Sequence, residues 1–338
     1  MNKRILITGI SGHLGKNLLV LLKNKDFEVR GLIRNKKEEQ EIKEIDPKVE
    51  VVYGDICDRE SLLPLFDNLD HKEVYLIHSA SKVDIQHQKI THDLIDVNVE
   101  GTKNIFSLAK ENGVIRSIYI SSVDSFKAVG KTIDETGAYA DEKKDGAYAL
   151  SKAKANEEIK AFRKEGMDIR IVYPCGFLGP LDKGKNHLNQ LLLSYLKGKI
   201  PGVIKASYTF ADVRDIAFGT LQALLEGKEN RDYILGGEVV SLESFLQYSR
   251  VAYSLQAKKI MVFPHWLARI GVPFIKLHGK ITHQRPLYTS FALSLLAHAN
   301  RFDDSRARNE LSYSPRSVEE SVQDSVRYFE EVGLLPKK

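Results

Sequence analysis

Short apolar runs alternate with longer amphipathic stretches over the first half of the chain. The apolar runs have the length of buried strands, and the stretches between them place leucine, isoleucine and alanine at helical spacing. The predicted strands cover residues 3–8, 28–33, 49–53, 74–78, 115–120 and 168–173, and the predicted helices cover 13–24, 59–66, 93–112 and 147–165. Alternating strands and helices are typical of a parallel sheet that carries helices on both faces.

Polar or otherwise distinctive residues gather at the ends of these predicted strands. The carboxyl ends of parallel strands meet along one edge of a sheet, and a dinucleotide binds where the strand order reverses. The residues at or just beyond the predicted ends are Thr8, Arg34, Tyr53, Ser79, Ser121 and Pro174. We therefore expect them to lie around one site.

A glycine-spaced turn joins the first predicted strand to the first predicted helix. The turn contains Gly9, Ser11, Gly12, His13, Leu14 and Gly15. Glycines at such a turn let the backbone approach a pyrophosphate, and the amino end of the helix offers unpaired N–H groups to the anion. Because this turn follows a strand and opens a helix, it predicts a nucleotide-binding loop rather than an ordinary tight turn.

Tyr148 and Lys152 stand four residues apart in a predicted helix, so they share one face of it. A lysine ammonium beside a phenol favours the phenolate and lowers a tyrosine pKa that is ordinarily about 10. Such a tyrosine exchanges a proton at neutral pH. The same spacing also occurs in ordinary solvent-facing helices, and the glycine-spaced turn is what gives it weight here.

Further motifs follow one another along the chain. They are Thr8-Gly9-x-x-Gly12-x-x-Gly15, Gly54-Asp55-Ile56, His78-Ser79-Ala80-Ser81, Asn98-Val99-Glu100-Gly101-Thr102, Ser121-Ser122, Tyr148-x-x-x-Lys152, the run from Pro174 to Pro180 and the run from Phe210 to Ala217. In this order and spacing they resemble the extended short-chain dehydrogenase/reductase family, also called the NAD-dependent epimerase/dehydratase family, over residues 3 to about 235.

The resemblance implies an α/β fold, a Rossmann-type doubly wound parallel sheet with a smaller C-terminal substrate-binding domain. It assigns residues 1–174 and 212–236 to the NADP-binding domain, and residues 175–211 and 237–338 to the small domain. It also implies cofactor contacts from Asp55 and Ile56 at the adenine, and from Ser79, Ala80, Ser81, Asn98, Tyr148, Lys152, Pro174 and Phe177. Asn98 has a second interpretation, as a residue that caps or kinks its own helix.

Arg34 bears on the choice of nicotinamide cofactor. An NAD site usually carries an acidic residue at the end of the second strand, where this chain has Arg34. A guanidinium is planar and always charged, which suits a 2′-phosphate. We therefore expect NADP(H) to be preferred over NAD(H), although an exposed loop arginine would look the same in sequence.

The resemblance implies hydride transfer between the nicotinamide and a carbonyl or alcohol carbon, with Tyr148 as proton donor. Ser122 would hold the same oxygen, and Lys152 would hold the nicotinamide ribose. Ser122 is preferred to Ser121 because the family's catalytic hydroxyl precedes an aromatic residue by four, here Phe126. Ser121 remains the fallback.

The composition excludes some classes of function but does not indicate one. The chain has 338 residues, 43% of them hydrophobic, and a net charge of +5 from scattered lysines and arginines, which indicates solvated surface rather than nucleic-acid binding. Cys57 and Cys175 lack metal-ligand spacing, so we expect no metal site. With no signal peptide and no membrane-spanning run, we expect a cytoplasmic protein, either a monomer or a homodimer.

The substrate is the least constrained part of the prediction. Nucleotide-sugar enzymes carry a diphosphate-binding arginine just before the stretch that begins here at Phe210, and Ser207–Thr209 offers none. Sugar dehydratases have Asp-Glu after the catalytic hydroxyl, where this chain has Val123-Asp124. The segments 232–237 and 302–316 instead resemble the branch of dihydroflavonol reductases and 3β-hydroxysteroid-dehydrogenase-like proteins. That likeness implies a small carbonyl or alcohol substrate with an apolar body.

Three alternatives stay open. The apolar segments 261–267 and 288–293 suit a substrate pocket, but they also suit core helices of the small domain. A membrane-surface patch around Trp266 and Phe274 is a further interpretation, against which stand the prolines at 264 and 273. The protein as a whole could also be a nucleotide-sugar epimerase or dehydratase, or a non-catalytic NADP(H) sensor.

Overall fold

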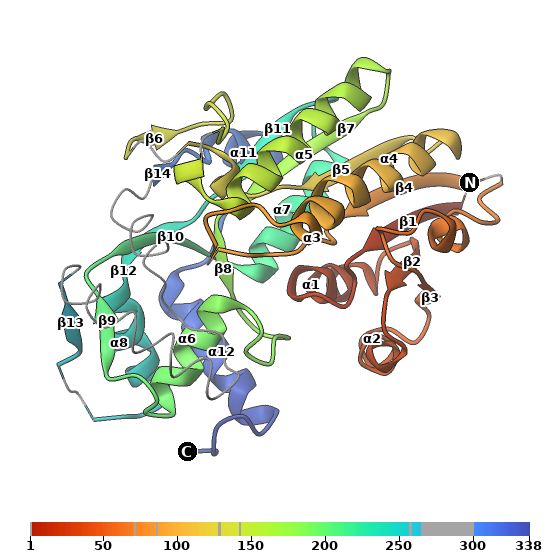
Figure 1. Ribbon diagram of the computed structural model, residues 1–338. Coiled ribbons are helices and arrows are strands. Elements are labelled where there is room, and N and C mark those ends of the chain that lie inside the picture. The colour runs from red at the N-terminus through yellow and green to blue at the C-terminus, as the bar shows by residue number, and fades with distance from the viewer. Residues whose placement is uncertain are drawn as a thin grey trace.

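A seven-stranded parallel sheet forms the larger lobe of the computed structural model, which describes residues 2–70, 72–85, 87–127, 130–141, 143–256, 259–264 and 301–338 (Figure 1). The strands run in the order β11-β7-β5-β4-β1-β2-β3. Their bounds are β1 Asn2–Thr8, β2 Glu28–Ile33, β3 Glu50–Tyr53, β4 Lys72–His78, β5 Arg116–Ile120, β7 Ile169–Pro174 and β11 Asp232–Leu235. All six predicted strands occur, and the predicted α/β Rossmann-type fold is confirmed.

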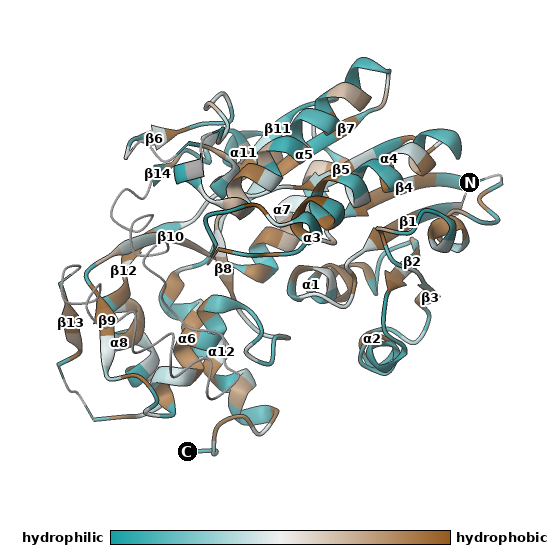
Figure 2. Cartoon of the chain, viewed as in Figure 1, coloured by the Kyte–Doolittle hydropathy of each residue, from teal (hydrophilic) through white to brown (hydrophobic). Residues whose placement is uncertain are grey.

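Helices cover both faces of this sheet. α4 (Gly101–Glu111) and α5 (Ala147–Lys164) lie together over one face, while α1 (His13–Leu22) and α7 (Val213–Leu225) pack against each other below the other (Figure 1). α2 (Glu39–Ile45) lies beside α1. The strands are predominantly apolar and the outer helix surfaces polar, which places the core between helices and sheet (Figure 2).

Two of the predicted helices take unusual forms. The stretch 59–66 is a 3₁₀ helix, η2 (Glu60–Leu65), with Pro64 inside it; proline has no N–H to donate within a helix. The stretch 93–112 is continuous but passes from α3 (His92–Ile95) through a π-helical turn, η3 (Asp96–Glu100), into α4. A π turn inside an α-helix often accompanies a functional site, and this one contains Asn98.

A smaller lobe has its own sheet and its own apolar core. β8 (Gly176–Leu178), β10 (Ser207–Asp212) and β12 (Glu238–Ser241) form the sheet, and α6 (His187–Leu196), α8 (Leu242–Ala252) and α12 (Val318–Glu331) pack around it. Phe210 stacks on Phe245 at 4.9 Å between ring centroids, and Phe329 is buried in the same cluster. The chain therefore builds two hydrophobic cores.

Short elements complete the two lobes. β6 (Thr132–Ile133) pairs with β14 (Arg301–Phe302), and β9 (Gly202–Ile204) pairs with β13 (Met261–Phe263). The 3₁₀ turns are η1 (Lys36–Glu38), η4 (Val123–Ser125) and η5 (Lys143–Asp145). α11 (Ser305–Leu311) packs beside β11 and contributes Ala307 and Leu311 to the core of the large sheet. The assignment of residues 237–338 to the small lobe stays a prediction. Within that range, α11 packs against the large sheet.

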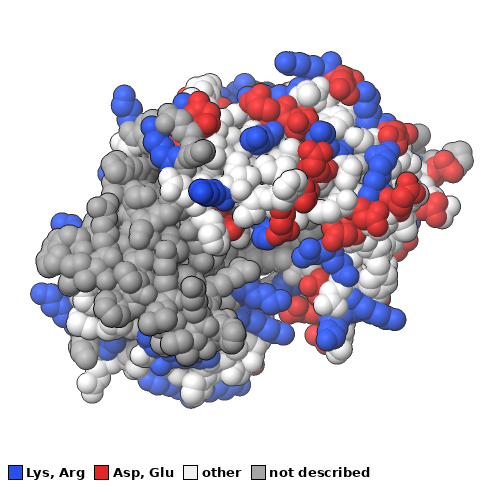
Figure 3. Space-filling model, viewed as in Figure 1, with Lys and Arg blue, Asp and Glu red and all other residues white. Residues whose placement is uncertain are grey.

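Part of the substrate prediction falls on residues outside the described ranges. Trp266, Phe274 and the segment 288–293 belong to this group. Of the apolar segment 261–267, β13 is described, and Met261 in it is exposed. No described helix combines the length and the apolar character that crossing a bilayer requires. Where α4 and α5 face the viewer, acidic and basic side chains are interspersed rather than separated by sign (Figure 3).

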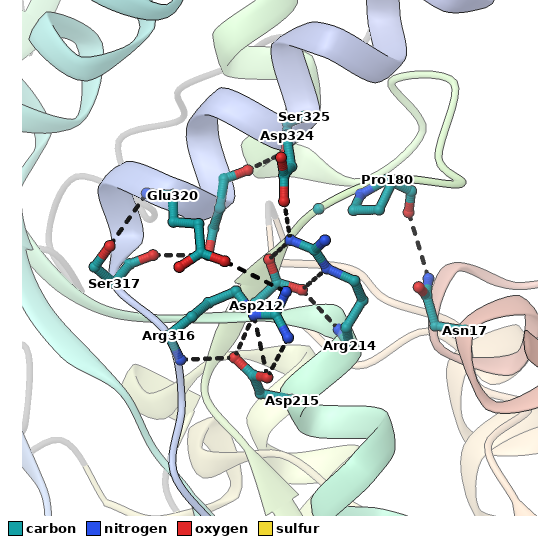
Figure 4. A network of polar contacts seen from close by, with 12 residues as sticks. Asn17, Pro180, Asp212, Arg214, Asp215, Arg316, Ser317, Glu320, Asp324 and Ser325 are labelled. Carbon is teal, nitrogen blue, oxygen red and sulfur yellow. Dashed lines mark hydrogen bonds and ion pairs between the residues drawn. The ribbon is translucent and has the colours of Figure 1, made fainter. Parts of the chain in front are cut away.

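A network of buried and half-buried charges connects the two lobes (Figure 4). Asp212 caps α7 and binds Arg214, whose guanidinium also reaches Asp324 on α12 at 2.6 Å. Asp215, 8% exposed, accepts hydrogen bonds from the Arg316 backbone N–H at 2.8 Å and from its guanidinium at 2.9 Å. The carboxylates of α7 thus fix the segment that leads into α12.

We predict that Asp215→Ala lowers the free energy of unfolding by about 3 kcal/mol, because the half-buried Arg316 loses its short hydrogen bonds and keeps only the 3.7 Å contact with Glu320. Urea denaturation followed by circular dichroism measures this. Glu320→Ala is the matched control: Glu320 is half-exposed and pairs with the same arginine at 3.7 Å, so its loss should cost at most about 0.5 kcal/mol. Equal losses for the two variants would contradict this assignment.

Candidate functional site

The glycine-spaced turn is shaped by close backbone contacts. Gly9 has a φ of +71°, and a Cβ on it would lie 2.7 Å from the backbone nitrogen of Ala80. A Cβ on Gly15 would lie 2.3 Å from the Gly9 carbonyl oxygen. Gly12 donates its N–H to that same oxygen at 2.9 Å. Side chains are therefore excluded where β1, α1 and the end of β4 meet.

The amino end of α1 opens at this turn. Gly12 is the N-cap residue and supplies no side-chain hydrogen bond, so the first N–H groups of the ten-residue helix remain available to an anion. Ser11 is half-buried beside it, and Leu14 packs into the core. These features fit a dinucleotide pyrophosphate, as the sequence predicts.

His13 lies between the turn and the small lobe. Its Nε2 is 2.9 Å from the Pro180 carbonyl oxygen, and its ring is 5.6 Å from that of Phe177 on β8. Burial lowers the pKa of His13 despite the nearby Asp182 carboxylate. A neutral His13 thus links the nucleotide loop to the segment after Pro174, where the resemblance places Phe177 at the cofactor.

The end of β4 lies directly against the turn. Ser79 donates its hydroxyl to the Thr8 carbonyl oxygen at 2.7 Å, and the Ala80 N–H reaches the Thr8 hydroxyl at 3.3 Å. Ser81 donates to Asn98 Oδ1 at 3.2 Å. Neighbouring β1 and β4 mark the reversal of strand order, so the three predicted residues stand at the switch point.

Asn98 connects several parts of the site by hydrogen bonds. Its Oδ1 accepts from Ser81 and from the Lys82 N–H, and its Nδ2 donates to the Lys82 carbonyl oxygen and to the Ser151 hydroxyl, the last two at 2.9 Å. An amide side chain makes four hydrogen bonds at most. All four go to protein groups, so Asn98 here ties the loop after β4 to α5, and a direct cofactor contact stays a prediction.

Arg34 follows the end of β2 and is largely exposed. Its side chain retains 71% of its accessible surface, and its Nη1 is 3.9 Å from Asp55 Oδ2. Asp55 also accepts the Cys57 N–H. Ile56 is buried and packs where Gly101 lacks a side chain. Arg34 and Asp55 are thus adjacent at the edge of the sheet, and the guanidinium is accessible to a ligand.

Tyr148, Lys152 and Ser122 converge at the end of β5. Tyr148 and Lys152 lie on the first turns of α5, and Ser122 caps the 3₁₀ turn η4. Ser122 and Tyr148 are 9% and 8% exposed. The Ser122 and Ser81 hydroxyls are near enough to the Tyr148 phenol to oppose the rise of its pKa. The three residues predicted to act together are therefore close in space.

The two adjacent serines have different surroundings. Ser121 is buried, and its hydroxyl donates to Asn156 Oδ1 at 2.7 Å. Ser122 instead interacts with Tyr148 and with Asp124. This geometry favours Ser122 over Ser121 as the hydroxyl that meets a substrate.

The expected effect of Lys152 on Tyr148 does not appear. Burial raises the pKa of Tyr148, the Asp124 charge raises it further, and the Ser122 and Ser81 hydroxyls oppose the shift. Lys152 points elsewhere: its ammonium donates to the Ile120 carbonyl oxygen at 2.9 Å, and burial lowers its pKa to about 7. The spacing puts both residues on one helix face, but burial is the largest influence on the Tyr148 pKa and the Lys152 ammonium is directed to Ile120.

A buried polar chain beneath the site was not predicted as part of it. His78 Nδ1 is 2.7 Å from the Thr8 hydroxyl, and Nε2 is 3.1 Å from that of Thr102. Burial first, and the charge of Lys152 second, lower the pKa of His78 to about 3, so the ring is neutral. The sequence feature that could have indicated this polar chain is His78, which ends a buried strand inside a motif of the family.

Comparison with known proteins decides the family. Residues 5–236, more than half of the chain, match the profile described as NAD dependent epimerase/dehydratase family. The chain belongs to the NAD-dependent epimerase/dehydratase family. The resemblance stated from the motifs is thereby confirmed, and with it the expectation of an NAD(P)-dependent enzyme that acts on hydroxyl and carbonyl groups.

Several curated relatives extend over nearly the whole chain. Sterol demethylase protein B of Methylococcus capsulatus is 28% identical, covering 98% of this chain and 99% of the relative. A Synechocystis protein provisionally named dihydroflavonol 4-reductase is 29% identical, covering 97% and 95%. A 3-beta-hydroxysteroid dehydrogenase of Mycolicibacterium neoaurum is 26% identical, covering 96% and 91%. The predicted likeness to this branch of the family is confirmed.

A solved structure agrees in fold over the full length. The crystal structure of gox2253 superposes with a TM-score of 0.80 at 26% identity, and the match covers 99% of this chain and 100% of that chain. Both lobes therefore have a counterpart in a solved protein.

We predict that Gly15→Ala weakens NADPH binding at least about tenfold, since the added methyl group would meet the backbone of the turn and force it open. Isothermal titration calorimetry measures the dissociation constant. Gly176→Ala is the control: its Cβ would meet its nearest neighbours at 3.5 Å, an ordinary contact. Unchanged NADPH affinity in Gly15→Ala would show that the turn does not hold the cofactor.

Proposed function

We propose that this family member is an NADP(H)-dependent oxidoreductase that reduces a ketone or aldehyde on an apolar small molecule, with Tyr148 as the proton donor. The observation that carries the proposal is the convergence of Tyr148, Ser122 and Lys152 at the end of β5, beside a glycine turn shaped for a pyrophosphate. Cofactor, proton donor and substrate-binding hydroxyl would then meet at one edge of the sheet.

Each residue of the proposed site has a separate role, which follows from its position. The N–H groups at the start of α1 would hold the pyrophosphate, and Lys152 the nicotinamide ribose. When bound, the nicotinamide supplies the hydride. Ser122 would orient the carbonyl oxygen, and Tyr148 would donate its proton to that oxygen as negative charge develops there.

The raised pKa of Tyr148 suits a proton donor. A buried phenol stays protonated at neutral pH and has its proton available for an alkoxide. In the reverse direction it must first lose the proton, which the bound cofactor and a charged Lys152 would assist. The arrangement therefore supports reduction as the easier direction at neutral pH.

The apolar substrate is inferred from the relatives and from the small lobe. Relatives are named for sterol and dihydroflavonol chemistry. β10, Ser207–Asp212, contains no arginine, and the guanidinium of Arg214 just beyond it is held by Asp212 and Asp324. These contacts support a substrate without a nucleotide diphosphate.

The test is NADPH oxidation with a panel of aldehydes, diketones, flavanonols and ketosteroids, set against nucleotide sugars. We expect turnover within the carbonyl panel only. Tyr148→Phe should lower kcat at least about 1,000-fold and leave the NADPH dissociation constant within about threefold. An active Phe variant would refute the mechanism. Stabilisation by nucleotide sugars with retained cofactor would favour an epimerase, and NADPH binding without any turnover would favour a sensor.

For the cofactor, we predict that Arg34→Asp raises the dissociation constant for NADPH at least about tenfold while that for NADH changes little, because a charge-assisted bond to the 2′-phosphate is lost. Fluorescence titration with each cofactor measures this. Lys23→Asp, the same change of charge on an exposed residue at the end of α1, should affect neither. Equal losses for NADPH and NADH in Arg34→Asp would refute the preference.

A further inference from the structure

Part of the small lobe is built from stretches of chain without acidic residues. Between Asp182 and Asp212 the sequence has five lysines and no aspartate or glutamate, and none occurs between Glu243 and Asp303. These two stretches supply α6, β9, β13 and all of α8 beyond Glu243. Basic side chains accordingly predominate along the lower edge of the molecule, where the small lobe lies (Figure 3).

The two stretches meet at a short pair of strands on the outer edge of the small lobe (Figure 1). β9 and β13 pair in parallel, with Gly202 beside Met261. Just beyond β9, the Lys205 N–H donates to the Phe263 carbonyl oxygen at 3.1 Å. Segments that lie about 60 residues apart in the sequence are thus held side by side by backbone hydrogen bonds.

Four exposed lysines flank this pair of strands, namely Lys197, Lys199, Lys205 and Lys259. Among the residues that the structure describes, none of their ammonium groups has a carboxylate partner. Lys199 and Lys205 stand on either side of β9, and six residues of chain span at most about 20 Å. Met261 lies between them and remains 50% exposed. We call these four lysines and Met261 the lysine face.

The composition of the lysine face fits a bilayer surface with negatively charged lipids. Lysine ammonium groups are attracted by anionic headgroups, and an exposed apolar side chain gains free energy where it reaches the acyl boundary. Proteins that bind single-stranded nucleic acids combine basic side chains with aromatic rings that stack on the bases. The lysine face has a methionine in that place, which favours lipid.

We propose that the lysine face docks on an anionic lipid bilayer and that the enzyme takes its apolar substrate from this surface. The second half of the inference rests on the proposed function, because it needs a lipid-like substrate, whereas the docking does not. The lysine face consists of other residues than the patch around Trp266 and Phe274 that the sequence suggests.

The first experiment measures co-sedimentation of the full-length protein with vesicles of phosphatidylcholine and phosphatidylglycerol. Wild type should bind these vesicles, and pure phosphatidylcholine should bind much less. Replacing Lys197, Lys199 and Lys205 together by alanine should lower the partition coefficient at least about tenfold, because each lysine near an anionic surface adds to the attraction. Sodium chloride at about 0.5 M should weaken wild-type binding, because salt screens exposed charges.

The matched control replaces Lys23, Lys25 and Lys48 by alanine, which gives the same net charge. These lysines are also exposed, but they border a hollow of the large lobe that carboxylates share, namely those of Asp26, Glu28, Asp46 and Glu50. The control should bind vesicles as wild type does. Equal losses in the two triple variants, or no binding of wild type to anionic vesicles, would overturn the inference. Binding of single-stranded RNA in place of vesicles, lost in the first triple variant alone, would assign the lysine face to a nucleic acid and overturn it too.

The second experiment measures turnover with a ketosteroid embedded in anionic vesicles and with a water-soluble aldehyde of the panel. The triple variant of the lysine face should lose at least about fivefold in kcat/KM for the embedded ketosteroid and stay within about twofold for the aldehyde. Unimpaired reduction of the embedded ketosteroid would contradict uptake of substrate from the bilayer. If wild type reduces no carbonyl of the panel, the proposed function fails, and co-sedimentation still decides whether the lysine face docks on lipid.

Discussion

The contact between backbones at the switch point is the constraint on which the rest of the site depends. β1, the start of α1 and the end of β4 approach so closely that a Cβ at Gly9 or Gly15 would overlap main-chain atoms. This contact leaves the first N–H groups of α1 unobstructed and sets Ser79 and Ala80 against Thr8. A phosphate-sized anion can meet the helix only because no side chain stands there.

Burial has the strongest effect on the titratable groups around this point. It lowers the pKa values of His78 and Lys152 and raises that of Tyr148, in each case as the largest cause. Each shift disfavours the charged form, as expected where water is excluded. His78 and Tyr148 are therefore neutral, and Lys152 is only partly protonated near neutral pH. A charged cofactor entering such an environment would change its proton affinities more than it would in water.

The two lobes are connected by charge as well as by chain. Asp212 at the end of β10 binds Arg214, and Asp215 on α7 binds Arg316. The two arginines connect these carboxylates to α12 and to the segment before it in the small lobe (Figure 4). His13 makes a second connection, from the nucleotide turn to Pro180. These contacts hold the small lobe, to which we assign the body of the substrate, in a fixed position against the nucleotide turn.

The sequence by itself determined the strand and helix alternation, the nucleotide turn and the shared helix face of Tyr148 and Lys152, because glycine spacing and periodicity are local properties of the chain. It also supported Ser122 over Ser121 through a family motif. Only the tertiary structure decided where the hydrogen bonds and charges go. Asn98 is fully used by protein groups, Lys152 donates to Ile120, and burial is the largest influence on the Tyr148 pKa. Such effects depend on burial and on neighbours brought together from distant segments, and a linear pattern does not contain them.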